Sequence, residues 1–205
     1  MGVRAVETLP QIEVEPVWEI AFLFPEQGQW GEEEYLALTT NHLVEYSHGL
    51  LEVLSMPTRA HQRLVAFLFR LLADFVEVHD LGEVFFAPYR VQLWPGKYRE
   101  PDLVYLTHER VLQSTEAYAV GADLAVEVVS EDAPMRDLQT KRREYAQAAI
   151  PEYWIVDPRK CKISVLRLEE RAYVVSGDYG PGEQALSVLL PGFGVDVAAV
   201  FAAAD

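Results

Sequence analysis

The segment that most restricts the fold is ADLAVEVVS, at residues 122–130. Side chains alternate between the two faces of a strand, and here both faces are hydrophobic. Such a strand is typical of a sheet that is covered on both sides. The exception is Glu127, because an ionised carboxylate is very costly to bury without a partner. The sequence therefore predicts a central strand whose one carboxylate is either paired or functional.

Helical and strand patterns are mixed around this segment. Hydrophobic spacing predicts the longest helix over 57–79, and Pro134 favours a helix over 134–149. Residues 42–56 predict two strands that meet in a turn at 47–49. Further strands are expected at 83–94, 102–106, 152–158, 161–168 and 171–179, a turn at 95–100, and short helices at 31–40, 108–114 and the C-terminus. The predicted fold class is α/β, a mixed β-sheet flanked by helices.

The size and composition of the chain narrow its class. A length of 205 residues predicts one domain over 1–205, with 1–30 as an extended N-terminal arm. A single cysteine, Cys161, excludes an internal disulfide and fits a reducing cytosol. No stretch approaches the roughly 18 apolar residues of a membrane span, and the N-terminus lacks the apolar core of a signal peptide. We therefore expect a cytoplasmic protein with no membrane partner.

The charge of the chain is strongly negative but unevenly distributed. The net charge of −15 argues against broad electrostatic binding to nucleic acid. Residues 1–60 carry ten acids and two bases, whereas residues 134–171 carry nine bases and six acids. A locally basic surface is compatible with a phosphate-bearing substrate, and it is equally compatible with an ordinary solvated face.

Two carboxylates lie on segments that can become neighbouring strands. Asp102 begins the strand at 102–106, and Glu127 lies inside the next long strand. Two carboxylates at close range raise each other's pKa unless a cation lies between them. Mg²⁺ uses oxygen ligands and often takes only one or two protein carboxylates plus water. A metal site is therefore one explanation of Glu127, and a salt bridge to a core arginine is the other.

The predicted helix after Glu127 carries a lysine that can face the same site. Asp137, Lys141 and Tyr145 are four residues apart, so they share one face of an α-helix. Lys141 could reach back to the carboxylates. The alternative is an ordinary surface pair between Asp137 and Lys141.

These residues carry a resemblance to a known superfamily. Pro101-Asp102, followed by Glu127 in EVV, resembles the PD-(D/E)XK nucleases. In the usual pattern the lysine stands two residues after the glutamate, where this chain has Val129; in some branches it lies on the following helix, a role that Lys141 would fill. The ordered motifs REPDLVYL, DLAVEVVS and RDLQTKRREYAQAAIPEYWIVDP resemble one bacterial branch of restriction-endonuclease-like proteins of unknown function, across about 40–160.

The resemblance implies further site residues. Glu45 matches a position that supplies an additional acid in some of these nucleases. His61 matches a histidine near a helix start, which either assists the metal site or only packs there. The resemblance also implies Asp102, Glu127 and the backbone carbonyl of Val128 as ligands of Mg²⁺ or Mn²⁺.

The main functional hypothesis is a metal-dependent endonuclease acting on DNA. Lys141 would orient the attacking water or stabilise the pentavalent phosphorus. Arg136, Arg142 and Arg143 would form a basic face that holds backbone phosphates. The alternatives are a catalytically inactive binding or regulatory module with the same fold, which the overall acidity favours, and a metal-dependent hydrolase of a small phosphate ester.

Two expectations concern assembly and mutation. A homodimer is expected, because apolar residues of the arm such as Phe22, Leu23 and Phe24 need cover. Replacing Lys141 with Ala is expected to leave the fold nearly intact and to remove cleavage, whereas Arg142→Ala would only weaken DNA affinity.

Overall fold

The computed structural model describes residues 24–40, 42–130 and 135–204. The strands are β1 (Val44–Ser47), β2 (Leu50–Val53), β3 (Gly82–Phe86), β4 (Arg90–Trp94), β5 (Lys97–Arg99), β6 (Leu103–Thr107), β7 (Tyr118–Val120), β8 (Leu124–Val128), β9 (Glu152–Asp157), β10 (Lys162–Glu169), β11 (Ala172–Tyr179), β12 (Gln184–Leu186) and β13 (Gly194–Asp196). The helices are α2 (Glu32–Ala37), α3 (Arg59–Val78), α4 (His108–Gln113), the π-helix η1 (Arg136–Lys141), α5 (Arg142–Gln147) and α6 (Val197–Ala202).

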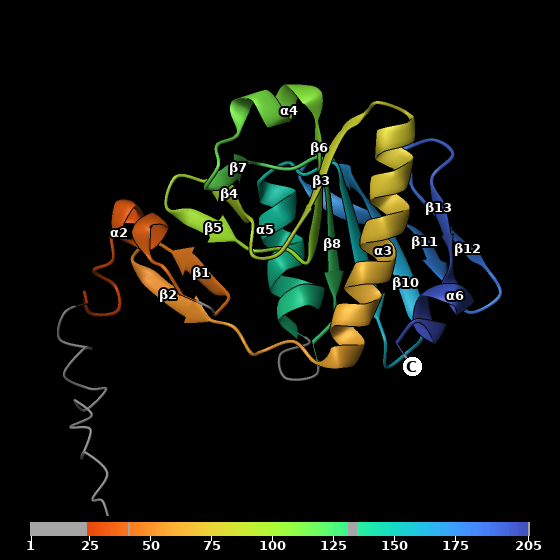
Figure 1. The fold of residues 1–205 in the computed structure, drawn as a ribbon, viewed down its shortest axis with the longest axis horizontal. Helices are drawn as coiled ribbons and strands as arrows, with labels where there is room; N and C mark the ends of the chain where they lie inside the picture. Colours follow the sequence, from red (N-terminus) through yellow and green to blue (C-terminus); the bar gives the residue numbers. More distant parts are fainter. Residues whose placement is uncertain (1–23, 41, 131–134, 205) are drawn as a thin grey trace, which may run out of the picture.

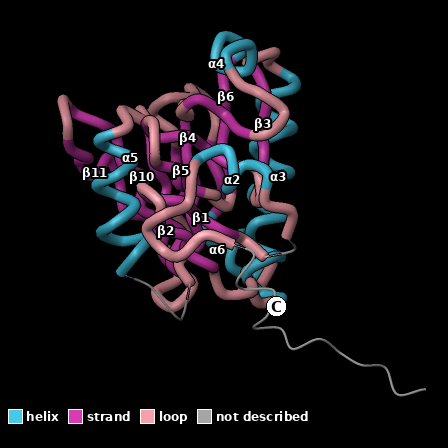
Figure 2. The backbone as a smooth tube through the Cα atoms, turned by 90° about the vertical axis from the view of Figure 1, so that its left-hand side faces the viewer, coloured by secondary structure: helices cyan, strands magenta, loops and turns pink. Residues whose placement is uncertain are grey.

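A six-stranded mixed sheet forms the centre of the molecule, in the order β11-β10-β9-β8-β6-β3. Strand β8 pairs with β9 in parallel and with β6 in the antiparallel sense. Helices α3 and α5 lie on opposite sides of the strands (Figures 1 and 2). The predicted α/β class, a mixed sheet flanked by helices, is confirmed.

Alternation along β8 divides its side chains between two cores. Leu124, Val126 and Val128 pack in the core that α3 covers, together with Leu64, Leu68, Leu72 and Val76 of that helix. Ala125 and Val129 pack in the core on the α5 side, which contains Tyr145. The apolar faces of the strand are therefore both buried, and Glu127 points to the α5 side because it shares the parity of Ala125 and Val129.

A second, five-stranded sheet stands beside the first, in the order β2-β1-β5-β4-β7. Its β1–β2 hairpin turns at His48 and Gly49, with φ of 46° and 88°. Positive φ at both positions is the requirement of the tight hairpin turn, and the second position suits glycine. The hairpin predicted at 42–56 is confirmed.

Several sequence predictions need correction in detail. Residues 83–94 form two strands in different sheets, β3 and β4, because Pro88 between them has no N–H for a ladder. The predicted turn at 95–100 contains strand β5. The predicted helix at 134–149 begins, in its described part, as a π-helix, and β7, β12 and β13 were not expected.

The start of the chain is described only from Phe24. Residues 1–23, with Phe22 and Leu23, lie outside the described part, as do 131–134 with Pro134. Phe24 stacks on Trp30, with ring centroids 5.8 Å apart. In the ranges that are described, no helix has both the length and the hydrophobicity to cross a membrane.

Candidate active site

The sheet register brings Asp102 and Glu127 to the same end of two paired strands. Leu103 of β6 lies opposite Val126 of β8 in an antiparallel ladder. One step further along this register, Asp102 lies opposite Glu127. The backbone N–H of Val128 donates to Asp102 Oδ2 at 2.8 Å, so the carboxyl group of Asp102 lies against the end of β8.

Glu127 is buried and held by two side chains of the helix that follows it. Lys141 Nζ and the Tyr145 hydroxyl both donate to Glu127 Oε1, at 2.8 and 2.6 Å. Lys141 ends η1 and Tyr145 lies in α5, so the four-residue spacing between them places both on the side facing β8. Burial and the neighbouring charge of Glu127 hold the pKa of Tyr145 well above its usual value.

Glu45 approaches the same lysine from the other sheet. Its Oε1 lies 3.5 Å from Lys141 Nζ, and its Oε2 accepts from Arg99 at 2.7 Å. Burial alone would raise the pKa of Glu45, but the charges of Lys141 and Arg99 outweigh burial and lower it. Lys141 therefore stands between two buried carboxylates, one from each sheet.

The pairing continues into a larger group that we call the buried ionic network. Arg99 also donates twice to Glu144, at 2.7 and 2.9 Å, and Lys97 Nζ lies 2.7 Å from the same carboxylate. The network consists of Glu45, Lys97, Arg99, Glu127, Lys141 and Glu144. Three acids face three bases, so the charges balance in a region that has little access to water.

Asp102 has a different partner on the α3 side. His61 Nε2 lies 3.2 Å from Asp102 Oδ2. His61 stands in the first turn of α3, where its N–H donates to the capping side chain of Thr58. Burial by itself lowers the pKa of His61, but the hydrogen bond to Asp102 and the charge of that carboxylate outweigh burial and raise it. The cap therefore holds the start of α3 in place, and the imidazole of His61 contacts the predicted site.

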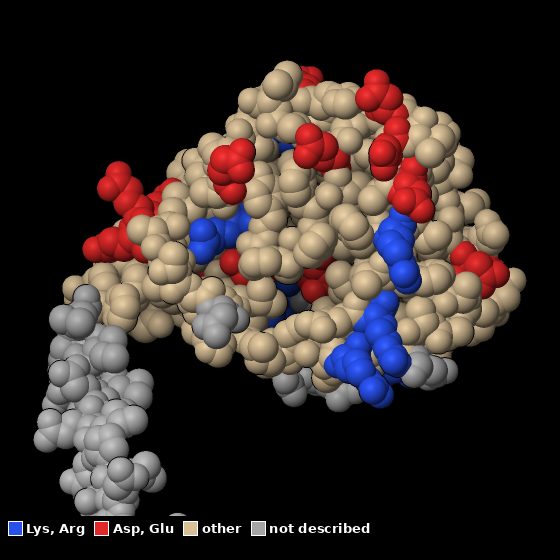
Figure 3. Space-filling model, in the orientation of Figure 1, with Lys and Arg blue, Asp and Glu red and all other residues tan. Residues whose placement is uncertain are grey.

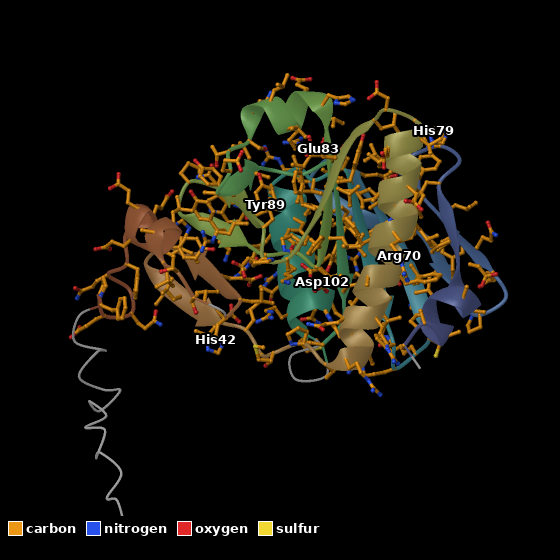
Figure 4. All side chains as sticks on the ribbon, in the orientation of Figure 1. His42, Arg70, His79, Glu83, Tyr89 and Asp102 are labelled. Carbon is orange, nitrogen blue, oxygen red and sulfur yellow. The ribbon has the colours of Figure 1, made fainter. Side chains whose placement is uncertain are left out.

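An apolar pocket of about 600 Å³ opens beside Asp102 and His61. Its walls come from the first three turns of α3, from 86–88 at the end of β3, from 56–57, and from Thr40, His42 and Leu43. Figure 4 shows Asp102 between α5 and α3, with Arg70 on α3 and His42 on a loop to the other side. Figure 3 shows a hollow in this region with acidic and basic atoms at its bottom. We call this cavity the α3 pocket.

The three arginines predicted as one basic face lie in different surroundings. Arg136 donates to Glu52 at 2.7 Å, and Arg142 donates to the carbonyl of Tyr173 at 2.9 Å. Arg143 is exposed. The three guanidinium groups therefore do not form one open surface. The side chain of Asp137 lies outside the described part.

A different set of arginines shares the face of the α3 pocket. Helix α3 carries Arg59, Arg63 and Arg70 in its first twelve residues and Asp74 and Glu77 in the remainder. Figure 3 shows basic atoms along the half of α3 beside the hollow and acidic atoms along the other half. The arginine spacing of four and seven residues, one and two helical turns, is the sequence signal for this face, which was not among the predictions.

The oxygen groups at the strand ends fit a hard divalent ion. Asp102, Glu127 and the backbone of Val128 meet where β6 and β8 are paired, and Mg²⁺ prefers such oxygen ligands with water in the remaining positions. Over the described ranges, no group of three or more His, Cys, Asp and Glu side chains is arranged to hold a metal. The fit to Mg²⁺ therefore rests on two carboxylates and one peptide group.

Comparison with known proteins agrees with this fold. A crystal structure from Anabaena variabilis ATCC 29413, described as "a putative nuclease belonging to DUF820", aligns with a TM-score of 0.69 and 16% identity, over 84% of this chain and 97% of that chain. This likeness shows the fold. No curated protein matches the chain significantly. The sequence model of the Uma2 family, described as "Putative restriction endonuclease", matches residues 32–198. The chain therefore belongs to the Uma2 family of restriction-endonuclease-like proteins.

Proposed function

We propose that this protein is a metal-dependent endonuclease that hydrolyses phosphodiester bonds in DNA. The observation that carries the proposal is the register that places Asp102 opposite Glu127 at the end of β6 and β8, with Lys141 bound to Glu127 and a pocket beside Asp102. Membership of a family described as restriction endonucleases supports the reaction class. The fold alone would not, because one fold serves many functions.

Asp102, Glu127 and the carbonyl of Val128 would hold Mg²⁺ or Mn²⁺. When bound, the ion supplies a Lewis acid for the phosphate oxygens and lowers the pKa of water. The contact from the Val128 N–H to Asp102 fixes that carboxyl group against β8 before any ion binds. His61 acts as a positioning residue on the other side of the same carboxylate.

Lys141 supplies the positive charge that the usual motif places at the position of Val129. Its ammonium group lies 2.8 Å from Glu127 Oε1, and in this proposal it would orient the attacking water or stabilise the charge that builds on phosphorus. Glu45 Oε1 lies 3.5 Å from the same ammonium group. The role of Glu45 in this proposal is one of positioning.

In this proposal the arginines in the first twelve residues of α3 would contact the DNA phosphates. Arg59 and Arg70 are exposed, and Arg70 lines the α3 pocket beside Asp102. Arg143, which is exposed on α5, is the remaining candidate from the predicted basic face. Such contacts would position the DNA backbone without reading its sequence.

A plasmid-nicking assay with purified full-length protein tests the proposal. We expect Mg²⁺- or Mn²⁺-dependent nicking that EDTA abolishes and that Asp102→Asn removes. The matched control is Asp74→Asn, the same charge change at an exposed site in the acidic half of α3. Equal nicking by wild type and Asp102→Asn would contradict the proposal.

The inactive binding module is the second candidate, and one observation favours it. Glu127 and Lys141 are both buried and paired with each other, as in a purely structural ion pair. On this hypothesis the protein binds DNA or another ligand but cuts neither single- nor double-stranded DNA with either metal. Binding of DNA in a gel-shift experiment, by protein that gives no nicking in the assay above, would favour the module.

A homodimer is part of the main proposal. Strand β2 is an edge of the five-stranded sheet, and its Leu50 and Val53 are exposed, as is Phe24. Exposed apolar side chains on an edge strand suit a second subunit. Light scattering at micromolar concentration tests this: we expect twice the monomer mass, and a monomer would refute it.

A further inference from the structure

We infer that the α3 pocket receives one unstacked nucleobase, so that the preferred substrate is single-stranded or locally unpaired DNA. This inference rests on the proposed nuclease function and adds a substrate class to it. The size of the pocket is the first argument. At about 600 Å³ it lies within the range of pockets that enclose a small organic ligand, which suits one nucleotide and not a duplex.

The walls of the α3 pocket suit a flat aromatic ring. Phe69 and Phe86 meet edge to face, with ring centroids 4.9 Å apart, and both line the cavity. Phe86 is 54% exposed and Met56 is 68% exposed, which is unusual for such large apolar side chains. Every base has a π-face, so stacking on aromatic side chains binds single strands with little sequence preference.

The charge of the pocket suits an anionic ligand. On a chain with a net charge of −15, the pocket lining includes one carboxylate, that of Asp102. The same lining includes Arg70 and two histidines, His42 and His61. A ligand that is apolar at one end and a phosphodiester at the other matches this combination.

The position of the pocket connects it to the chemistry. Asp102 and His61 belong both to the pocket wall and to the candidate metal site. A base held between α3 and residues 86–88 would therefore keep its own sugar and phosphate beside Asp102. Removing a base from an intact duplex costs free energy that a single strand or a bulge does not require. The geometry therefore favours unpaired DNA.

The test measures binding separately from cleavage, by fluorescence anisotropy with Ca²⁺ in place of Mg²⁺. Two labelled duplexes are compared, one with a single bulged nucleotide and one with an abasic bulge at the same place. We expect the wild type to bind the bulged base about 5- to 100-fold more tightly, the range of one base stacked on an aromatic side chain. Phe86→Leu, which keeps an apolar side chain without a π-face, should erase this difference, and Phe86→Trp should retain it.

Leu112→Ala is the matched control, because Leu112 is 87% exposed on α4 and does not line the α3 pocket. It should bind both duplexes as the wild type does. Equal wild-type affinity for the two bulges, or an unchanged preference in Phe86→Leu, overturns the inference. Cleavage of intact duplex by Phe86→Leu at the wild-type rate, with no base preference, would leave the nuclease standing and remove the pocket's role. A binding preference that depends on Phe86, in a protein that cleaves no DNA, would support the role of the pocket and contradict the nuclease function.

Discussion

Asp102 and Glu127 lie opposite each other at one end of the same sheet, yet their side-chain partners differ. Glu127 faces α5, where it belongs to the buried ionic network. The carboxylate of Asp102 contacts His61 of α3, and a pocket of about 600 Å³ opens beside it. One carboxylate is enclosed by fixed charges, and the other is placed where a ligand can reach it.

The α5 side and the α3 side of the central sheet therefore differ in what they contribute to the site. Buried charges keep their geometry because breaking their pairing is expensive. Half-exposed groups are more easily rearranged by a ligand, because water can replace the contacts they lose. The α5 side would therefore hold the site in shape, and the α3 side would admit the substrate. If this is so, substitutions of buried charged or hydrogen-bonded groups should destabilise the fold more than substitution of Asp102.

Lys141→Met is expected to have the largest effect on folding. The variant removes a cation shared by Glu127 and Glu45, and breaking a buried pair from one side costs about 3–5 kcal/mol. Chemical denaturation measures the loss. This replaces the expectation from sequence that Lys141→Ala leaves the fold nearly intact, because the structure buries the lysine.

A surface control and a double variant show whether the loss of stability in Lys141→Met comes from the buried ion pair. Arg143→Met, at an exposed site on α5, should change stability by no more than about 0.5 kcal/mol. The double variant Glu127→Gln/Lys141→Met should be more stable than the sum of its single changes predicts, because the buried charge is removed with its partner. Strict additivity would show that the pair is not coupled.

Tyr145→Phe is expected to have the next largest effect. The variant keeps the ring that packs edge to face on Tyr153 and deletes the hydroxyl that donates to Glu127. A hydrogen bond to a charged group contributes about 1.5–3 kcal/mol. Thermal and chemical unfolding should show a loss of this size, and Tyr179→Phe on the edge strand β11 serves as the control. A loss no greater than that of the control would contradict the assignment.

The buried carboxyl group of Glu100 should make the stability of the fold depend on pH. Burial raises its pKa to about 8, although Arg90 Nε lies 3.6 Å away. The folded state then holds a proton that the unfolded state has released, so stability is lost as pH rises from the unfolded pKa, about 4.3, through 8. Glu100→Gln should remove at least about 1.4 kcal/mol of this decline, the equivalent of one pKa unit. Parallel denaturation profiles for the two proteins from pH 5 to 9 would contradict the prediction, and Glu33→Gln on α2 is the exposed control.

Asp102→Asn is expected to have the smallest effect on folding. Its side-chain oxygen can still accept from the Val128 N–H, so we expect a change within about 1 kcal/mol at pH 8. The pKa of His61 should fall, because the hydrogen bond and charge of Asp102 are the largest of the effects that raise it against burial. A histidine with a raised pKa stabilises the fold below its unfolded value of about 6.5, and this contribution is lost as pH rises through the folded value. The variant should therefore lose more stability at pH 5 than at pH 8, and an NMR titration of the imidazole protons follows the pKa directly.

The sequence predicted the site best where local pattern was sufficient. A carboxylate inside an apolar strand required a partner, and the four-residue spacing of Lys141 and Tyr145 pointed to one face of the following helix. The helix at 57–79 and the hairpin at 42–56 followed from periodicity and turn residues in the same way. In each case the deciding residues lie close together in the chain.

The parts that the sequence did not predict depend on contacts between distant segments. Arg99 meets Glu45 only because β1 pairs with β5, across 54 residues of sequence. The α3 pocket needs walls from α3, from 86–88 and from the loop residues His42 and Leu43, so no local pattern indicates it. The arginines of η1 and α5 looked like one basic face because their sequence gives no sign that Arg136 meets Glu52 of the hairpin.

The π-helix at 136–141 has a consequence for how such sites are recognised. A π-helix accommodates an additional residue that an α-helix of the same length would not, and such turns are frequent at functional sites. Here the wide turn ends at Lys141, and the regular α-helix that follows sets the angle between Lys141 and Tyr145. Length differences between the glutamate strand and the lysine can thus be absorbed without turning the lysine away. In this chain the direction of the lysine is therefore set by its four-residue interval to Tyr145 and not by the number of residues that separate it from Glu127.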